Sequence, residues 1–171
     1  TCTLTDTALG AFNFKNSQMM KSNGRFLTID ASITASVPAE YALLMLEKDE
    51  KNGFFYLLQV LEFIDDTGYS QKPITASFLG NKLAVLFETN PGTVTPTSPQ
   101  AIVIYNYSEK TGVFELEDSF RDFEGVFDGL DVYNASTASD SERSSICFVN
   151  SKTIIIKRSS TLVRGFTARP I

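Results

Sequence analysis

Apolar and polar residues follow each other in short runs along this chain, and two segments repeat the same order of runs. Residues 41–55 and 100–115 each place one apolar run before a polar turn and another after it, and they align on a shared Glu-Lys-X-Gly. In the second segment, residues 101–107 are β-branched and aromatic, which is the composition typical of strands. Apolar and acidic side chains then alternate over residues 113–117, as on a strand with one wet face. The second segment is therefore predicted to form a β-hairpin.

The first segment is ambiguous when it is read alone. Residues 42–48 are good helix formers, but their apolar positions show no 3.6-residue period. Asn52-Gly53 follows them and is a strong hairpin signal, and the match with the second segment also favours strands. Because residues 54–58 are apolar on both faces, we expect this hairpin to lie centrally in a sheet.

The repeat extends back from each hairpin towards the N-terminus. Residues 22–29 and 79–86 each contain small polar residues, a basic residue and then a β-rich run, and residues 149–156 form a third version. In this alignment the three basic residues correspond to one another: Arg25, Lys82 and Lys152. The chain is therefore predicted to contain about three related units of short antiparallel strands.

Two segments between these units have the composition of loops. Residues 89–99 are too Pro-rich for a core strand, and residues 136–145 are rich in Ser. The length of 171 residues suits one domain with a full core. We therefore predict a single β-rich domain over residues 1–171, with imperfect units at about 22–78, 79–135 and 146–171.

This order of strand, turn, strand and hairpin, over Ser22 to Arg164, resembles the blades of β-propeller proteins. The chain contains no Trp, so it lacks the Trp-Asp signature of some propellers. The resemblance implies an all-β fold of antiparallel sheets. A closed ring takes about four to eight blades, so closure would require more chain, a partner subunit or self-association. The residues themselves also permit a single β-sandwich or barrel with similar hairpins, or an α+β fold.

Composition places the chain among ordinary globular proteins, with 43% hydrophobic and 20% charged residues. No apolar run approaches the roughly 20 residues of a membrane-spanning helix, so we expect no transmembrane segment. The chain begins with Thr1 instead of Met, which we interpret as a mature or processed chain or a recombinant piece.

Charge is distributed unevenly along the chain. The net charge is -5, yet the last six basic residues, from Arg143 onward, are accompanied by no acid, which leaves -11 on the remainder. Such asymmetry can mark a partner surface, although a basic strand beside acidic neighbours in one fold is the plainer interpretation. The candidate surface residues are Lys152, Lys157, Arg158, Arg164 and Arg169. Only Phe148 and Phe166 are aromatic in this region, so we expect no nucleic-acid partner.

Cysteines and N-glycosylation sequons bear on the cellular compartment in which the protein occurs. A bridge between Cys2 and Cys147 would close most of the chain and stabilise it by roughly 4–5 kcal/mol in the chain-entropy model, whereas two buried free thiols are the alternative. Asn106 and Asn134 each begin an Asn-X-Ser sequon, and chance alone gives about two in such a sequence. These features are compatible with an extracellular or secretory-pathway protein, which is our expectation.

Chemistry-bearing motifs are few. The chain has no His, which removes the usual general base near neutral pH and every His-containing triad, and we expect no enzyme activity. Acids are dense between Glu115 and Asp131, where Asp128 and Asp131 could supply two oxygens to a calcium ion, although solvated turns and strand faces are the plainer interpretation. Phe120, Phe123 and Phe127 recur at helical spacing, as in a hydrophobic patch that binds a partner or an apolar ligand, or in ordinary core packing.

Two functions fit these patterns. The first is a non-enzymatic interaction or structural module, a subunit or processed piece of a larger extracellular or membrane-associated assembly, with other protein chains as partners. The alternative is a small lipocalin-like β-barrel that carries an apolar ligand, although the Gly-X-Trp opening of that family is missing.

Overall fold

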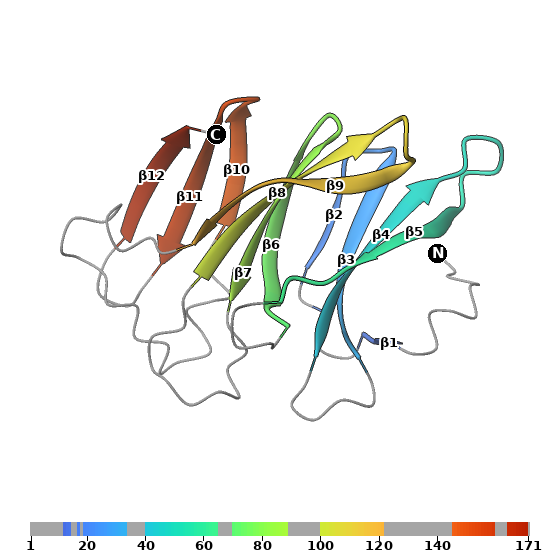
Figure 1. Cartoon of the computed structure of the whole chain (residues 1–171), viewed down its shortest axis with the longest axis horizontal. Helices are drawn as coiled ribbons and strands as arrows, with labels where there is room; N and C mark the ends of the chain where they lie inside the picture. The colour runs from blue at the N-terminus through green and yellow to red at the C-terminus, as the bar shows by residue number, and fades with distance from the viewer. Residues whose placement is uncertain are drawn as a thin grey trace.

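The computed structural model describes residues 12–14, 17, 19–33, 40–64, 70–88, 100–121, 145–159 and 164–170. Within these residues every regular element is a β-strand, and no helix occurs. The strands form three antiparallel sheets that follow one another along the chain and lie side by side (Figure 1). The prediction of an all-β fold of antiparallel sheets is therefore confirmed.

The first sheet is built by the N-terminal part of the chain. Its strands are β1 (Phe12–Asn13), β2 (Met20–Ser22), β3 (Phe26–Ile33), β4 (Tyr41–Lys48) and β5 (Phe55–Leu61). The short strands β1 and β2 pair with successive parts of the same edge of β3, which leaves β5 at the opposite edge. The prediction that this hairpin lies centrally in a sheet therefore holds for β4, which pairs with β3 and β5, and is wrong for β5. Both faces of this sheet carry packed side chains, so an edge strand here can be apolar on both faces.

The second and third sheets are simple antiparallel meanders. The second contains β6 (Lys72–Leu79), β7 (Lys82–Glu88), β8 (Gln100–Ser108) and β9 (Val113–Arg121), in that order. The third contains β10 (Ser145–Asn150), β11 (Thr153–Ser159) and β12 (Arg164–Pro170). Among the described strands, the first two sheets are thus four strands wide and the third is three strands wide.

The repeated hairpins of the sequence are structural copies down to an irregularity in their ladders. The β4–β5 ladder shifts register between Met45 and Leu46, and the β8–β9 ladder shifts between Ile104 and Tyr105. When the two hairpins are aligned on their shared Glu-Lys-X-Gly, these are the same positions. Each shift leaves one residue of the edge strand without a partner, which is the arrangement of a β-bulge. The two hairpins therefore share the position of their bulge.

The turns of these two hairpins also match. Gly53 and Gly112 both adopt positive φ, at 75° and 73°. The amide of Gly53 donates to the carbonyl of Asp49 at 2.7 Å, and that of Gly112 donates to the carbonyl of Ser108 at 2.8 Å. Glycine takes positive φ at little steric cost, so the shared glycine fixes the same turn twice.

The first turn of each sheet follows the same plan. The flanking strand pairs leave a two-residue turn in each sheet, at Gly24–Arg25, Gly80–Asn81 and Ser151–Lys152. Arg25, Asn81 and Lys152 are therefore equivalent. The sequence alignment of Arg25 with Lys82 is wrong by one residue, because it matched the basic residues, whereas the structure matches the two glycines of positive φ.

Successive sheets pack face to face. The buried side chains between the first and second sheets include Phe26, Leu43, Met45, Leu83, Val85 and Val103. Those between the second and third sheets are Ala84, Leu86, Ile102, Ile104, Ile146, Phe148 and Ile154. Strand β6 contacts both β2 and β10, so the leading strands of the three sheets are neighbours (Figure 1). Strand alternation directs one set of side chains to each neighbouring sheet, and both faces of the second sheet are consequently buried.

Candidate functional site

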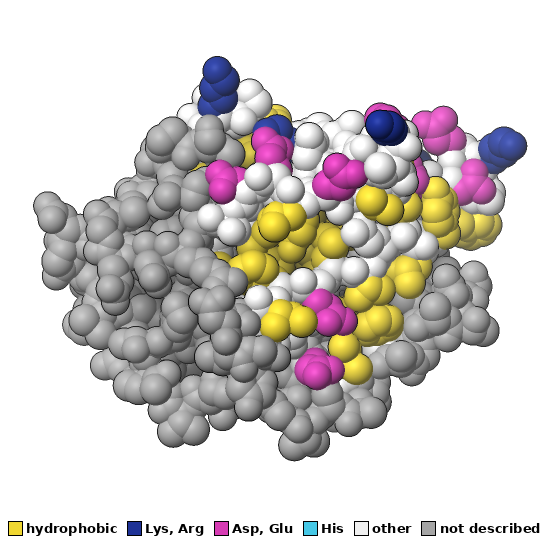
Figure 2. Space-filling model, viewed as in Figure 1, with side chains coloured by type: hydrophobic (Ala, Val, Ile, Leu, Met, Phe, Trp, Pro, Cys, Tyr) yellow, Lys and Arg dark blue, Asp and Glu magenta, His cyan; other side chains and the backbone are white. Residues whose placement is uncertain are grey.

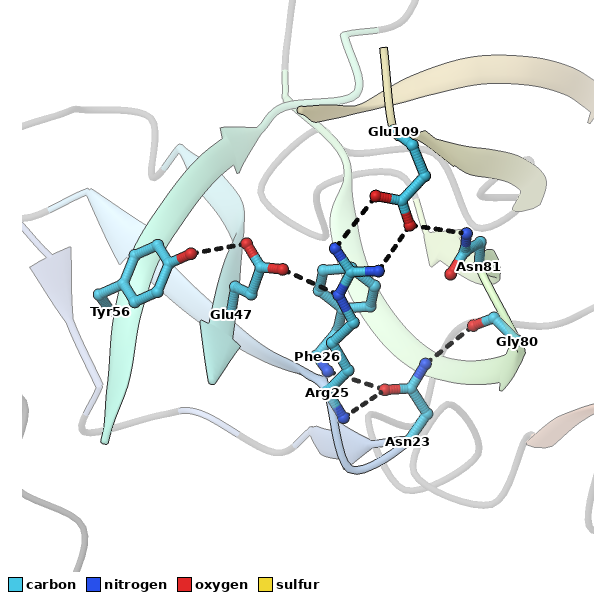
Figure 3. Close-up of polar contacts among 8 residues, drawn as sticks. All are labelled: Asn23, Arg25, Phe26, Glu47, Tyr56, Gly80, Asn81 and Glu109. Atoms are coloured by element: carbon cyan, nitrogen blue, oxygen red, sulfur yellow. Dashed lines mark hydrogen bonds and ion pairs between the residues drawn. The ribbon is translucent and has the colours of Figure 1, made fainter. Parts of the chain in front are cut away.

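A polar network joins the first and second sheets at the end where their turns lie (Figure 3). It begins in the β2–β3 turn with Asn23, whose side-chain oxygen accepts hydrogen bonds from the backbone amides of Arg25 at 3.1 Å and Phe26 at 2.8 Å. The Asn23 side-chain amide donates to the carbonyl oxygen of Gly80 in the β6–β7 turn at 2.8 Å. One side chain thus holds its own turn and ties it to the equivalent turn of the next sheet.

Arg25 is the centre of this network. Its Nε donates to Glu47 Oε1 at 2.8 Å within the first sheet, and its Nη1 donates to Glu109 Oε1 at 2.6 Å in the β8–β9 turn of the second sheet. The guanidinium carbon lies 4.7 Å from the ring centroids of both Phe26 and Tyr107. A planar guanidinium can form a fork of hydrogen bonds and stack on aromatic rings at once, so Arg suits this position better than Lys.

Hydrogen bonds in the network shift the pKa values of Arg25, Glu109 and Tyr56. Hydrogen bonding to Arg25 lowers the pKa of Glu109, and the same contact raises the pKa of Arg25. The Tyr56 hydroxyl donates to Glu47 Oε2 at 2.6 Å, and this hydrogen bond, followed by burial, raises the pKa of Tyr56 to about 12. A general acid or base would need a pKa close to the working pH. The network therefore has the character of a joint between two sheets.

A second joint links the edge strands of the same two sheets. The backbone amide of Phe114 on β9 donates to the side-chain oxygen of Gln59 on β5 at 2.8 Å, and the Gln59 amide donates to the Phe114 carbonyl at 3.2 Å. This paired contact satisfies both main-chain groups of one β9 residue. Together with the Arg25 network, it fixes how the first and second sheets lie against each other.

Hydrophobic side chains are exposed on the face that these edge strands form. Phe54 is 65% exposed and Tyr56 47% exposed at the β4–β5 hairpin, and Leu116 on β9 is 62% exposed. Figure 2 shows hydrophobic side chains in several patches over β9, β5 and the region between them, with Asp and Glu side chains beside them. Exposed apolar residues are common on protein surfaces, so these patches alone assign no partner.

The third sheet has one covered face and one open face at β10. Ile146 and Phe148 are buried against the second sheet, whereas Cys147 and Val149, which alternate with them, are exposed. Lys152 is exposed in the adjacent β10–β11 turn.

The five basic residues predicted as a partner surface all fall on this third sheet. Lys152 is in its first turn, Lys157 and Arg158 lie on β11, and Arg164 and Arg169 lie on β12. The structure thus brings them to one sheet. Their role as a partner surface stays a prediction.

The remaining predicted sites fall partly outside the described residues. Cys147 is a free, exposed thiol, so the alternative of a buried thiol is wrong at this position. Cys2, Asn134, Asp128 and Asp131 lie outside the described residues, so the disulfide, the second sequon and the calcium site stay predictions. Asn106 is exposed on β8. Phe120 ends up on β9, while Phe123 and Phe127 are also outside the described part.

The described part of the chain holds no group of three or more Cys, Asp or Glu side chains placed to bind a metal ion. It also has no helix of the length and hydropathy needed to cross a bilayer.

The sequence reasoning missed the Arg25 network altogether. Arg25 was noticed only as part of a repeated turn, and its partner Glu109 lies 84 positions away. The repeat itself held a signal, because Glu109 belongs to the duplicated Glu-Lys-X-Gly turn. No family model, curated protein or solved structure matches this chain.

Proposed function

We propose that this chain is a non-enzymatic interaction module made of stacked β units, and that it serves as a subunit or processed piece of a larger extracellular or membrane-associated assembly. The duplicated unit carries this proposal: two hairpins share their turn and their bulge, and each sheet buries its faces against the next one. Units that cannot bury their faces alone stack on neighbours, and arrays of this kind present extended surfaces to partners.

We further propose that the units are blades of the β-propeller type. Three features support this reading: each sheet is an antiparallel meander, successive sheets pack face to face, and the leading strands β2, β6 and β10 are neighbours. Three units are fewer than the roughly four to eight that close a ring. In this proposal, a closed ring of blades requires further polypeptide in addition to this chain.

The polar groups of the described part favour a structural role over catalysis. The most connected charged residue, Arg25, bonds to Glu47 in its own sheet and to Glu109 in the next sheet. An extracellular or secretory-pathway location is supported by the Asn106 sequon, because Asn106 is exposed on β8 where a glycan can be accommodated.

Native mass spectrometry of the natural material tests this function. We expect a complex that contains other polypeptides in addition to this chain, and dissociation of the complex under denaturing conditions. A bare monomer of 18.9 kDa that releases an adduct of a few hundred daltons would refute the interaction module and favour the small ligand carrier.

A further inference from the structure

Each of the first two sheets packs one face against the next sheet. The corresponding face of the third sheet has no neighbour among the described residues. The first sheet turns Leu43 and Met45 towards the second sheet, and the second sheet turns Ile102 and Ile104 towards the third. In the aligned hairpins these two pairs occupy the same positions. The corresponding face of the third sheet presents Val149, which is 55% exposed, together with exposed Cys147 and partly exposed Thr153 and Ile155.

The first and third sheets carry a basic side chain at the same position of their first turn, whereas the second sheet carries Asn81 there. Arg25 sits in the first turn of its sheet and pairs with Glu109 at a hairpin tip of the next sheet. Lys152 is the equivalent residue in the third sheet. It is exposed, and none of the described carboxylates pairs with it. By analogy with Arg25, whose carboxylate partner Glu109 lies on the covering sheet, a carboxylate for Lys152 would belong to whatever covers the third sheet.

A second copy of this chain would fit the open face of the third sheet poorly, whether the two copies met face to face or head to tail. Two third sheets placed face to face would bring together segments that carry only basic residues, since no acid occurs after Glu142. Juxtaposed like charges disfavour an interface. In a head-to-tail arrangement the third sheet would meet the outer face of the first, but Leu44 and Leu46 there are already fully buried and Phe12 and Phe14 pack against them.

We infer that the open face of the third sheet, marked by Cys147, Val149 and Lys152, docks a different protein that presents an apolar sheet face and a carboxylate at a hairpin tip. This inference rests on the proposed function and names the partner's chemistry. Both interfaces inside the chain consist of alternating apolar side chains from the two sheets, and the interface between the first and second sheets adds the Arg25–Glu109 pair at its turn end. The basic third sheet selects an acidic partner by charge complementarity.

Thiol labelling of the natural complex tests the inference, with Cys147 as a reporter inside the proposed interface. A Cys2→Ser chain is expressed in the source organism, so that Cys147 is the single thiol. A fluorescent maleimide is then applied to the isolated complex and to the purified chain. We expect labelling of Cys147 in the complex to be slower by about tenfold or more, because thiol reactivity depends on access.

Matched variants separate this face from the rest of the molecule. Lys51→Cys, in a chain without the two native cysteines, places the thiol in the exposed β4–β5 turn and should label equally fast in the complex and in the free chain. Lys152→Glu should remove the protection of Cys147, whereas Lys152→Arg should keep it. Lys152 is exposed in a turn, so circular dichroism of both variants should match that of the parent chain.

The other possible results of this experiment would contradict the docking face, the nature of its partner or the proposed function, as follows. A complex in which Cys147 labels at the free rate would overturn this docking face and leave the interaction module standing. Protection of Cys147 in the purified chain that rises with its concentration would assign the face to a second copy. The absence of any complex would overturn the proposed function together with the inference.

Discussion

The duplication of the two hairpins makes a quantitative prediction about their glycines. Gly53 and Gly112 have nearly the same positive φ, at 75° and 73°. A methyl group added at Gly112 would meet no atom within 4 Å, and at Gly53 it would meet only Lys48 Cε at 3.9 Å, an ordinary contact. Substitution by Ala therefore introduces no clash, and its cost comes from the backbone conformation alone.

That cost can be worked out for both positions. An L-residue with a side chain loses roughly 1–2 kcal/mol in the left-handed region. Replacing Gly by Ala also restricts the unfolded chain, which offsets about 0.4–1 kcal/mol. Gly53→Ala and Gly112→Ala should therefore each lower the free energy of unfolding by about 1 kcal/mol, equivalent to roughly 2–4 °C in Tm for a chain of this size.

Urea unfolding followed by far-UV circular dichroism measures both values. Gly53→Asn and Gly112→Asn serve as controls, and they should be less destabilising because Asn enters the left-handed region more readily than Ala. The reasoning is refuted if one alanine variant is neutral while the other loses about 2 kcal/mol, because structural copies must respond alike.

Four further predictions follow from the packing and the polar network. Ile154→Ala should lower the free energy of unfolding by about 2–5 kcal/mol in urea titrations, since this fully buried side chain joins the third sheet to the second; an effect below about 1 kcal/mol would mean that the third sheet is not docked there. Thr28→Val should be neutral or stabilising by up to about 1 kcal/mol, because the buried Thr28 hydroxyl has no hydrogen-bond partner and the variant keeps its shape. Arg25→Met should make the free energy of unfolding less sensitive to NaCl than in the parent chain, whereas Arg25→Lys should keep that sensitivity, and equal salt dependence in all three proteins would contradict the network. Folding raises the pKa of Tyr56 from 10.0 to about 12, so its contribution to stability is complete below pH 10 and is lost as the pH rises towards 12; Tyr56→Phe should remove one late-ionising phenol from the absorbance titration at alkaline pH, and an unchanged titration curve would contradict the hydrogen bond to Glu47.

The strands and the turns were largely readable from the sequence. The β-branched run of β8 and the shared Glu-Lys-X-Gly of the two hairpins are local signals, and the structure forms strands and glycine turns there. The duplication extended further than the sequence indicated, because the shared bulge depends on ladder register. Register could not be assigned reliably from residue types, as the one-residue error between Arg25 and Lys82 shows.

The contacts between sheets were not readable in the same way. Arg25 and Glu109 belong to different units, and nothing local to either residue specifies the other. The apolar residues of β5 indicated a central strand, whereas the strand lies at an edge of a sheet that is packed on both faces. Side-chain burial depends on what covers a face, and the covering residues are distant in sequence.

The sequence by itself determined the all-β class and the hairpins, because β propensity and the conformational freedom of glycine act over a few residues. The tertiary structure decided how the units meet: which face of each sheet is buried, which carboxylates Arg25 pairs with, and that Val149 and Lys152 stand on an open face. These features depend on packing between segments far apart in the chain, where alternating apolar strands fit several arrangements almost equally well and only the assembled core selects one.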